Sequence, residues 1–584
     1  MLSENAREVL RQRYLFRDEK GQVIEKPDGM FRRVAWHIAS VERLFPAGDM
    51  EFWGRKYYEL MSRLEFLPNS PTLMNAGRPR GQLSACFVLP IEDNLESIFE
   101  TLKNTALIHQ SGGGTGFSFS RLRPVGDVVR STMGTTSGPI SFMTVYNTAT
   151  EVVKQGSVRR GANMAVLRVD HPDIEEFITV KRNRDRLNNF NLSVGITDAF
   201  MAAVEADEPF ELIHPSSGAV VQVVQARRIF DLITRMAWEN GEPGVLFLDR
   251  INAVNPTPSL GSFESSNPCG EQPLLPYESC NLGSINLVKM LKRSTSGGWE
   301  LDFAKFRDTI HAAIRFLDSA IDVNSFPLEK TREITLANRK IGLGVMGFAD
   351  MLIYLGIPYN SEAAVNKAEK IMGFMDEQSV LASEELAGER GAFPNFTQST
   401  YAAAGRKPLR NATTTTIAPT GSISIIAGCS SGIEPLFAIA FTRNVLNNNL
   451  LADINPVFLT LAAEYKFDNP QILKQVRKEG IATVVEGIPP QIRRCFITAY
   501  EIAPEWHIRI QAAFQQYTHN AVSKTINYPT DATVIDVEKG FLLAYQYGCK
   551  GLTVYRDGSR AEQVLTRGLQ NNHCELTTGC SCEN

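Results

Sequence analysis

The first part of the chain has apolar residues at helical spacing. Val34, Ile38 and Val41 would share one face of a helix, and the apolar clusters of FWGRKYYELMSRLEFLP follow. The pattern predicts a helical N-terminal region over residues 1–66.

After this region the pattern changes to short apolar runs that are typical of buried strands. SACFVLP, GTGFSFSRL, ANMAVLRV, NLSVGIT and PGVLFLD are such runs, with amphipathic segments between them. One segment places Val365, Ala368 and Met372 on one helical face, and this helix should end near Gly388. Alternating strands and helices predict an α/β body over residues 67–560, and its length favours a closed barrel over an open sheet.

The composition is that of an ordinary soluble globular protein. The chain has 584 residues, of which 43% are hydrophobic and 21% charged, and its net charge is −4. Because charges of both signs are interspersed, there is no basic face, and we expect no nucleic-acid polymer as a partner. No apolar run is long enough for a membrane span, and the first residues lack the apolar core of a secretion signal. We therefore expect a cytoplasmic protein with no membrane partner.

The run SSNPCGEQPLLPYESC places a cysteine, Cys269, between a proline and a glycine. Pro268 and Gly270, with two further prolines, exclude a regular helix or a central strand, so the run predicts a shaped loop. Alternate side chains of an extended loop point the same way, so Asn267, Cys269 and Glu271 would converge on one small ligand. A thiol, a carboxylate and an amide together indicate a chemical role for this loop rather than a packing role. A buried structural cysteine in a proline-rich turn is the alternative.

A second candidate site is the run TTTIAPTGSISIIAG. Its hydroxyls at Thr420, Ser422 and Ser424 and its free backbone amides would bind an anion if a helix starts there. A Ser/Thr-rich helix cap is the alternative. The run GGGTG lacks the ending of a phosphate-binding P-loop and is a weak signal when taken alone.

Nine cysteines are spread too thinly for the disulfide framework of a small secreted domain. Three of them lie in residues 561–584, a polar stretch that we interpret as a flexible redox-active tail. Cys580 and Cys582 are the expected exchange pair, because Cys574 has no close thiol neighbour. A zinc site that includes His573 is the alternative, but the spacing fits no usual zinc finger, and we predict no metal site.

Five separated features occur in one order along the chain: SPTLMNAG, SACFVLP, NPCGE, Cys280 and APTGS. Together they resemble the ribonucleotide reductase large subunit over about residues 50–560. The run GCKGLTVYRDGSR resembles the adenosylcobalamin-dependent class II branch, and Tyr555 lacks the adjacent tyrosine of class I enzymes. The resemblance implies a ten-stranded α/β barrel with a finger loop through its centre, which would explain the shaped loop.

The resemblance also implies catalytic roles. Cys269 would become a thiyl radical, generated by adenosylcobalamin, and remove the 3′ hydrogen of the ribose. Glu271 would accept the 3′-hydroxyl proton, and Asn267 would hold the ribose hydroxyls. Cys86 and Cys280 would form the redox dithiol, which requires the fold to bring two distant positions together. Cys429, Cys495 and Cys549 match no catalytic position of the family and are interpreted as structural.

By the same resemblance, several motifs would bind the ribonucleotide, which we expect to be a diphosphate. Its phosphates would lie at the turn over residues 419–424. The implied substrate-binding residues are Thr72, Ala85, Cys86, Gly114, Asn267, Pro268, Cys269, Gly270, Glu271, Pro419, Thr420, Gly421, Ser422, Ile423 and Ser424.

The family also has a specificity site for a dNTP or ATP effector at a homodimer interface. Asp93 matches the acid that binds the effector ribose, and Arg123 and Arg130 match residues near its triphosphate. Loops over residues 131–138 and 155–163 resemble the two that carry the effector signal to the substrate base.

The implied activity is reduction of ribonucleotides to 2′-deoxyribonucleotides for DNA synthesis, with a thioredoxin or glutaredoxin-like reductant acting through the tail. The chain has no room for the ATP cone of many relatives, so we do not expect on/off control by ATP and dATP. One alternative is a class I large subunit that needs a metal-bearing radical partner, and another is an inactive nucleotide-binding regulatory relative. Turnover by the chain with only cobalamin and a dithiol would separate them.

Overall fold

The computed structural model describes residues 2–79, 81–129, 133–155, 159–445, 449–560 and 565–569. Arg130 and the tail cysteines Cys574, Cys580 and Cys582 lie outside the described residues, as do parts of the two expected signalling loops.

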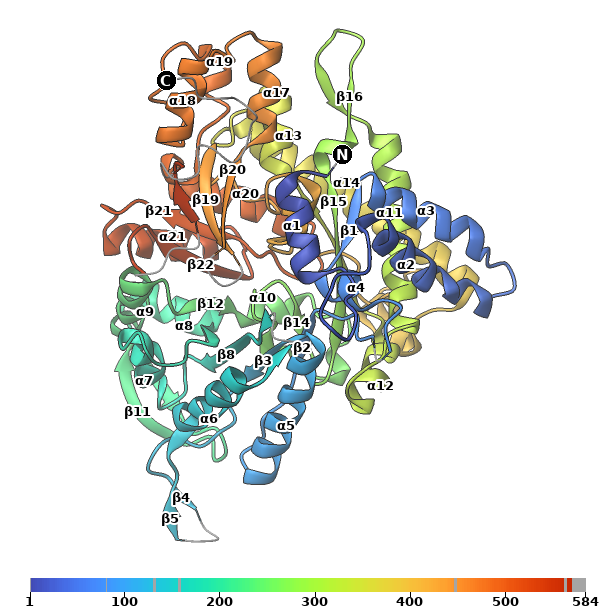
Figure 1. Cartoon of the computed structure of the whole chain (residues 1–584). Helices are drawn as coiled ribbons and strands as arrows, with labels where there is room; N and C mark the ends of the chain where they lie inside the picture. The colour runs from blue at the N-terminus through green and yellow to red at the C-terminus, as the bar shows by residue number, and fades with distance from the viewer. Residues whose placement is uncertain are drawn as a thin grey trace.

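The N-terminal part is helical, as its apolar spacing predicts. It contains α1 (Glu4–Arg13), α2 (Pro27–Ala39), the short 3-10 helix η1 (Ser40–Leu44) and α3 (Met50–Ser62). Helices α2 and α3 pack on each other and on α11 (Phe303–Asp322) (Figure 1). Val34 and Ile38 are fully buried there, which fixes how this helical layer sits on the rest of the chain.

Ten strands form one mixed sheet. The five predicted apolar runs correspond to its parallel strands β2, β3, β8, β9 and β12, and these predictions are confirmed. Strand β15 is antiparallel to β2, and β22 is antiparallel to β12. The strands in spatial order are β1 (Phe66–Pro68), β15 (Ser279–Asn286), β2 (Cys86–Val88), β3 (Gly114–Ser118), β8 (Asn163–Arg168), β9 (Phe190–Ile196), β12 (Gly244–Phe247), β22 (Gly551–Arg556) and β21 (Thr525–Tyr528), and β18 (Ile341–Met346) also pairs with β15.

The two ends of this sheet approach each other through irregular segments. Leu343 of β18 bridges to Thr415, and Ile417 bridges to Val522, which lies just before β21. The intervening segment therefore bridges β18 to β21, and the paired segments from β15 round to β18 form a closed ring.

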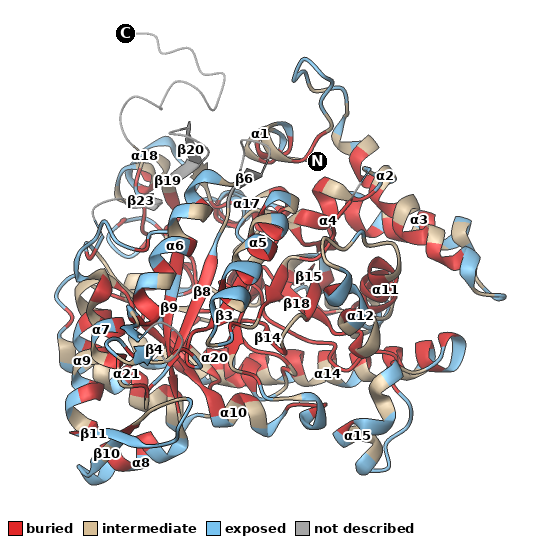
Figure 2. Ribbon diagram, turned by 90° about the horizontal axis from the view of Figure 1, so that it is seen from below, coloured by how far each residue is buried: buried red, intermediate tan, exposed pale blue. Residues whose placement is uncertain are grey.

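Helices and smaller sheets surround the ring (Figure 1). Most buried residues lie on the strands and on the helix faces that pack against them (Figure 2). The main helices of the body are α5 (Leu95–Ser111), α6 (Gly138–Val152), α7 (Ile174–Thr179), α8 (Asp198–Ala206), α9 (Ala226–Asn240), α12 (Glu329–Asn338), α13 (Phe348–Tyr354), α14 (Glu362–Arg390), α20 (Pro504–Gln515) and α21 (Val534–Gln546). A lobe late in the chain contains β19 (Ala440–Val445), β20 (Asn449–Ile454), α17 (Pro456–Glu464), α18 (Pro470–Glu479) and β23 (Leu565–Arg567).

The shaped loop predicted around Cys269 lies at the tip of a hairpin. Strands β13 (Ser265–Ser266) and β14 (Pro273–Leu274) flank it, and β13 packs against β2, β3 and β8. A Cβ atom on Gly116 of β3 would lie 1.8 Å from the carbonyl oxygen of Ser266. Glycine is therefore required at this position for the hairpin to approach the sheet.

The predicted end of one helix is confirmed to within two residues. The sequence predicts an end near Gly388, and α14 ends at Arg390, followed by Gly391, whose φ is +85°. The last turn is held by Arg390, whose buried guanidinium pairs with Glu42 and Asp318. These ion pairs offset the weak helix propensity of the internal glycine.

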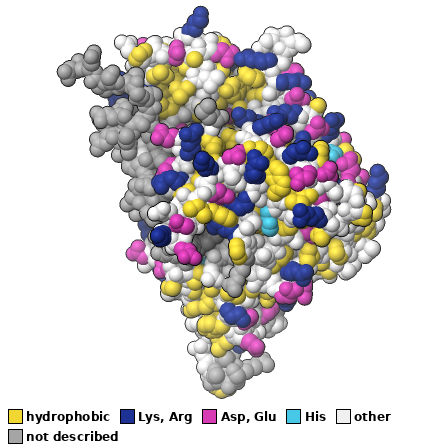
Figure 3. Space-filling model, turned by 45° about the vertical axis from the view of Figure 1, so that its right-hand side comes forward, with side chains coloured by type: hydrophobic (Ala, Val, Ile, Leu, Met, Phe, Trp, Pro, Cys, Tyr) yellow, Lys and Arg dark blue, Asp and Glu magenta, His cyan; other side chains and the backbone are white. Residues whose placement is uncertain are grey.

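The surface carries no single dominant charge. Figure 3 shows lysine and arginine side chains interspersed with aspartate and glutamate on the viewed face. Within the described part of the chain, no helix is both long and apolar enough to cross a membrane.

Candidate active site

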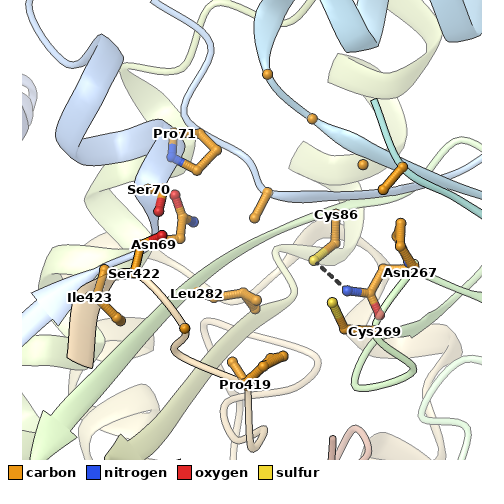
Figure 4. Close-up of a pocket in the computed structure, with 18 of the residues that line it drawn as sticks. Asn69, Ser70, Pro71, Cys86, Asn267, Cys269, Leu282, Pro419, Ser422 and Ile423 are labelled. Atoms are coloured by element: carbon orange, nitrogen blue, oxygen red, sulfur yellow. Dashed lines mark hydrogen bonds between the residues drawn. The ribbon is translucent and has the colours of Figure 1, made fainter. Parts of the chain in front are cut away.

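A cavity of about 340 Å³ lies at the amino ends of β2, β3 and β8, where the hairpin loop enters the barrel. The loop residues and Cys86 line one end of it. Asn69, Ser70 and Ser422 line the other end (Figure 4). The cavity therefore has a thiol-rich end and a hydroxyl-rich end.

The loop is held by its own hydrogen bonds. Asn267 Oδ1 accepts the backbone N–H of Gln272 at 3.0 Å, and the carbonyl of Asn267 accepts the N–H of Gly270 at 3.0 Å. Asn267 Nδ2 donates to Sγ of Cys86 at 3.1 Å (Figure 4). Cys269 is exposed and lines the cavity beside this amide. The amide thus connects the loop to the neighbouring strand.

Cys86 and Cys280 lie directly opposite each other on the antiparallel strands β2 and β15. Such cross-strand positions have Cα atoms about 4.5–5.5 Å apart, which is within the range of a disulfide. Both thiols are buried, and burial raises the pKa of each well above its ordinary value. The fold therefore brings the predicted pair together in the reduced form.

Glu271 is almost completely buried, at 2% exposure. Burial raises its pKa to about 7, although a hydrogen bond from the Asn267 side chain opposes the shift. Its Oε2 atom has no hydrogen-bond partner among the described residues. This carboxyl group can therefore exchange a proton near neutral pH.

Most of the expected substrate-binding residues line the cavity. They are Ala85, Cys86, Gly114, Asn267, Pro268, Cys269, Glu271, Pro419, Thr420, Gly421, Ser422 and Ile423.

Three of the expected residues do not line it. The Thr72 hydroxyl lies 3.0 Å from both Asn69 Oδ1 and the carbonyl of Leu83, so it is engaged in the fold. Ser424 lines a neighbouring cavity, and Gly270 turns the loop with a φ of +83°.

The expected phosphate turn has an unusual backbone. Thr420 has a φ of +54°, a left-handed conformation that is costly for a β-branched residue. Its Oγ1 accepts the N–H of Gly432 at 2.7 Å, which holds this shape. The short helix α16 (Ile423–Ala427) starts directly after the turn. The helix start on which the expected anion site was conditional is therefore present.

Sequence reasoning missed Arg13, the last residue of α1. Its Nη1 donates to Oγ of Ser422 at 3.3 Å, and its side chain lines the cavity. Among the described residues around the cavity, it is the only arginine or lysine. No local motif marks it, because α1 also carries Arg7 and Arg11 on an ordinary amphipathic pattern.

The candidate effector residues Asp93 and Arg123 do not line this cavity. Asp93 precedes α5, and Arg123 follows β3. Arg123 Nε donates to Asp93 Oδ2 at 2.7 Å, and its Nη1 donates to the carbonyl of Val128 at 3.3 Å. Val128 belongs to β4 (Val128–Val129), which pairs with β5 (Gly134–Thr135) in a projecting hairpin (Figure 1).

A second cavity, of about 540 Å³, also reaches Cys269. Phe437, Thr525 and Asn527 line it and also line a third cavity of about 840 Å³. A buried Lys524 lines the second cavity and donates to Glu434, a residue of the third, at 2.7 Å. Cys269 is therefore accessible from two separate spaces.

The chain matches two family models. "Ribonucleotide reductase, barrel domain" matches residues 84–555, and "Ribonucleotide reductase, all-alpha domain" matches residues 1–81. The similarity thus begins at residue 1, whereas the motifs alone indicated a start near residue 50.

Two curated relatives share the name vitamin B12-dependent ribonucleoside-diphosphate reductase. The protein from Thermoplasma acidophilum is 48% identical over 623 residues, covering 97% of this chain and 80% of the relative. The protein from Mycobacterium tuberculosis strain H37Rv is 48% identical over 591 residues, covering 100% and 83%. A solved structure, the Actinobacillus ureae class Id ribonucleotide reductase alpha subunit, has a TM-score of 0.78 at 24% identity, over 95% of this chain and 97% of that one. The last comparison supports the fold alone.

Proposed function

The chain belongs to the ribonucleotide reductase family, and on that premise we propose that it is an adenosylcobalamin-dependent ribonucleoside-diphosphate reductase. It converts ribonucleoside diphosphates to 2′-deoxyribonucleotides for DNA synthesis. One observation carries this proposal: the Cys86 and Cys280 pair lies beside the loop of Asn267, Cys269 and Glu271, at one end of a cavity of nucleotide-compatible size.

The loop residues begin the reaction on the ribose. Cys269, as a thiyl radical, removes the 3′ hydrogen, and Glu271 accepts the proton of the 3′-hydroxyl. The raised pKa of Glu271, about 7, suits a group that takes a proton and later returns it. Asn267 holds the ribose hydroxyls from a position fixed by Gln272 and Cys86.

The cysteine pair completes the reduction. Loss of the 2′-hydroxyl as water requires one proton, and placing hydrogen on C2′ in its stead requires a second proton and two electrons. Cys86 and Cys280 supply two protons and two electrons when they close to a disulfide, and their cross-strand position makes this closure sterically accessible.

The second and third cavities fit the cofactor. Phe437 and Tyr500 offer aromatic faces to a corrin ring, and Thr525 and Asn527 offer hydrogen bonds to its amide side chains. When bound, adenosylcobalamin supplies the radical that oxidises Cys269. The cysteine lies where this space meets the substrate cavity, so the two ligands approach it without sharing a site.

The hydroxyl-rich end of the substrate cavity binds the phosphates. Arg13 adds a positive charge beside the backbone and hydroxyl donors of Ser422 and Ser70. The expected contacts of Thr72, Gly270 and Ser424 remain predictions.

An apolar surface next to the candidate effector residues supports a homodimer. Leu95, Phe99 and Leu107 of α5 and Val145 and Val152 of α6 are between 40% and 78% exposed. Paired copies would bury these side chains and place a dNTP or ATP effector near Asp93 and Arg123. Arg130, which lies outside the described residues, remains a predicted residue of this site.

A thioredoxin or glutaredoxin-like protein re-reduces the dithiol through the tail pair Cys580 and Cys582. A dithiol that must be reset after every turnover requires a reducing compartment, which supports the cytoplasm as the location.

Assay of the purified chain tests the function. With adenosylcobalamin, a small dithiol and ribonucleoside diphosphates, we expect deoxyribonucleotides without a second protein. Cys269→Ser should give none while binding the diphosphate within a few-fold of the parent, because a hydroxyl holds its hydrogen too tightly to replace the thiol. Turnover that requires a metal-bearing partner would contradict the class II proposal, and product from Cys269→Ser would contradict the role of that residue.

A further inference from the structure

The two sulfurs of the redox pair differ in access. Cys86 lines the substrate cavity, whereas Cys280, also within the described residues, does not line it and is 0% exposed. Sγ of Cys280 instead lies 3.5 Å from the carbonyl oxygen of Lys340, on the far side of the pair. A thiolate that enters the cavity therefore meets Cys86 first.

The charges around the two sulfurs also differ. Lys340 Nζ donates to Glu278 Oε2 at 2.6 Å, and both side chains are 1% exposed. The ammonium group is held in place, because it also lies 4.5 Å from the ring centre of Phe263. Glu278 is fixed as well, since Asn338 donates to its Oε1 at 2.6 Å and the N–H of Leu275 to its Oε2 at 2.7 Å.

The main electrostatic influences on the two thiols differ. Burial raises the pKa of Cys280, the Lys340 ammonium opposes that shift, and Glu278 and Glu271 add to it. At Cys86, burial raises the pKa, Glu271 and the other two cysteines raise it further, and the hydrogen bond from Asn267 opposes this. Lys340 is therefore a main influence on Cys280 but is not among the main influences on Cys86.

We propose that the Cys86–Cys280 disulfide is reduced in one direction only: the incoming thiolate attacks Sγ of Cys86, and Cys280 leaves beside the Lys340–Glu278 pair. This inference rests on the proposed function, because it requires the two cysteines to form the disulfide during turnover. Lys340 is then a positioning residue that favours departure of Cys280.

In the first exchange, the attacking sulfur of the reductant forms a bond to Cys86 Sγ and the bond between the two cysteines breaks. The electron pair of that bond stays on Cys280 Sγ, which takes one proton from water. In the second exchange, the other thiolate of the reductant attacks the reductant sulfur that is bonded to Cys86, and Cys86 is released and also takes a proton. The reductant dithiol loses two electrons and the cysteine pair gains them.

A trapping experiment tests the direction on the full chain. The full-length protein with Cys269→Ser and with the tail cysteines Cys574, Cys580 and Cys582 also changed to serine, which removes the competing thiols, is oxidised to the Cys86–Cys280 disulfide and treated briefly with excess glutathione. Acid quenching, alkylation of the free thiols with iodoacetamide and peptide mapping locate each group. We expect glutathione on Cys86 and the alkyl group on Cys280. Glutathione mainly on Cys280, or equally on both, would overturn the proposal.

A separate measurement tests the proposed function independently of the direction of reduction. The parent chain with substrate and cofactor, but no reductant, should accumulate the Cys86–Cys280 disulfide after one turnover. If this disulfide does not form, the proposed function of the pair is wrong, whatever the trapping experiment gives.

The role of Lys340 is tested in a variant in which Lys340 and Glu278 are both replaced by neutral residues, called the neutral pair. Lys340→Met combined with Glu278→Gln removes both charges without leaving one buried alone. Reduction of the disulfide by a small dithiol should slow roughly two- to threefold, because loss of Lys340 raises the pKa of the leaving thiol more than loss of Glu278 lowers it, and a leaving thiol with a higher pKa departs more slowly. The disulfide formed per turnover should not change, and Lys340→Arg should retain most of the rate. A parental reduction rate in the folded neutral pair would make Lys340 purely structural and overturn its role.

Discussion

Glu271 shows how one residue can combine a catalytic role with a cost in stability. Its pKa is raised to about 7 by burial, so the folded protein holds a proton there that the unfolded chain loses near pH 4.5. The stabilising effect of the neutral form is fully present below pH 4.5 and is lost as pH rises to about 7. Above that pH the buried carboxylate lowers the free energy of unfolding by about 3 kcal/mol.

Glu271→Gln should therefore raise stability at pH 8 and abolish turnover. We expect kcat to fall by at least about a hundredfold, because an amide cannot accept the hydroxyl proton. In the parent, kcat/KM should rise with pH through about 7, as the base loses its proton. Denaturant unfolding and kinetics at pH 5 and pH 8 check both effects. A variant that is less stable at pH 8, or that keeps turnover, would contradict this reading.

Arg13 provides a test of the phosphate end of the cavity. Arg13→Met should raise the KM for ribonucleoside diphosphates by about ten- to a hundredfold, since a charge-assisted hydrogen bond contributes about 1.5–3 kcal/mol. The value of kcat should change much less, because the thiol-rich end is untouched. Arg11→Met on the same helix is the matched control, since Arg11 is exposed and pairs with Glu8. Equal KM values for the two variants would place the phosphates elsewhere.

The comparison of these residues shows which site features a sequence can reveal. Asn267, Cys269 and Glu271 could be predicted together, because they alternate within one loop and the structure places all three at the cavity. Arg13 could not, because only the packing of α1 against α16 brings it to Ser422. Thr72 belongs to a clear sequence motif, but its hydroxyl donates to the carbonyl of Leu83 within the fold and does not line the cavity.

At the scale of elements, a buried ion network joins α11 to its neighbours. Asp318 of α11 pairs with Arg339 at 2.8 Å and with Arg390 of α14 and Arg410 at 3.2 Å. Although burial alone would raise it, the three guanidinium groups hold the pKa of Asp318 well below its ordinary value. The network therefore fixes the end of α14 and connects the helical layer to the barrel.

Asp318→Asn should destabilise the protein by about 3–5 kcal/mol, because it removes the carboxylate shared by three buried guanidinium groups and leaves them only Glu42 and Asp322. The contribution of Asp318 is present at neutral pH and is lost as pH falls through its depressed pKa, so the difference between parent and variant should shrink in strong acid. Chemical denaturation as a function of pH measures this. Asp308→Asn on the same helix is the control, since Asp308 is exposed and should change stability by less than about 0.5 kcal/mol. Similar losses in both variants would contradict the role of the network.

The strands and the end of one helix could both be predicted from local patterns. Continuous apolar runs such as ANMAVLRV are typical of strands that are covered on both faces, and β8 is buried along most of its length. The end of α14 lies within two residues of its predicted place, and Gly391, with a φ of +85°, is a local signal for it. The ion pairs of Arg390 with Glu42 and Asp318 could not be predicted, because these partners come from distant parts of the chain. Local chemistry therefore predicts which segments form elements, and long-range contacts decide how the elements are joined.

At the scale of the whole molecule, the fold brings together positions that the sequence separates widely. Cys86 and Cys280 become direct cross-strand partners only because β15 returns to lie beside β2. Family resemblance identified the pair, but spacing alone could not, since six cysteines lie in the described body. The ring of strands in turn encloses the hairpin loop, which gives Cys269 access to two cavities.

Dimer formation should depend on the exposed apolar surface of α5 and α6. The exposed apolar surface of α5 and α6 lies next to Asp93 and Arg123, so a change there should affect both dimer formation and the response to effectors. Phe99→Asp places a charge on this surface, where it would have to be desolvated on pairing. We expect the dimer dissociation constant to rise at least tenfold, and a dNTP should no longer change which substrate base is preferred. Turnover without effector should be largely kept.

Phe52→Asp is the matched control for this assembly test, because Phe52 on α3 is 51% exposed and Phe99 is 50% exposed. Analytical ultracentrifugation and competition assays with mixed ribonucleotides, each with and without a dNTP, measure the two effects. If Phe99→Asp remains dimeric, the interface lies on another surface. If it becomes monomeric but still responds to a dNTP, effector binding does not require the second copy, and the effector site is complete within one chain.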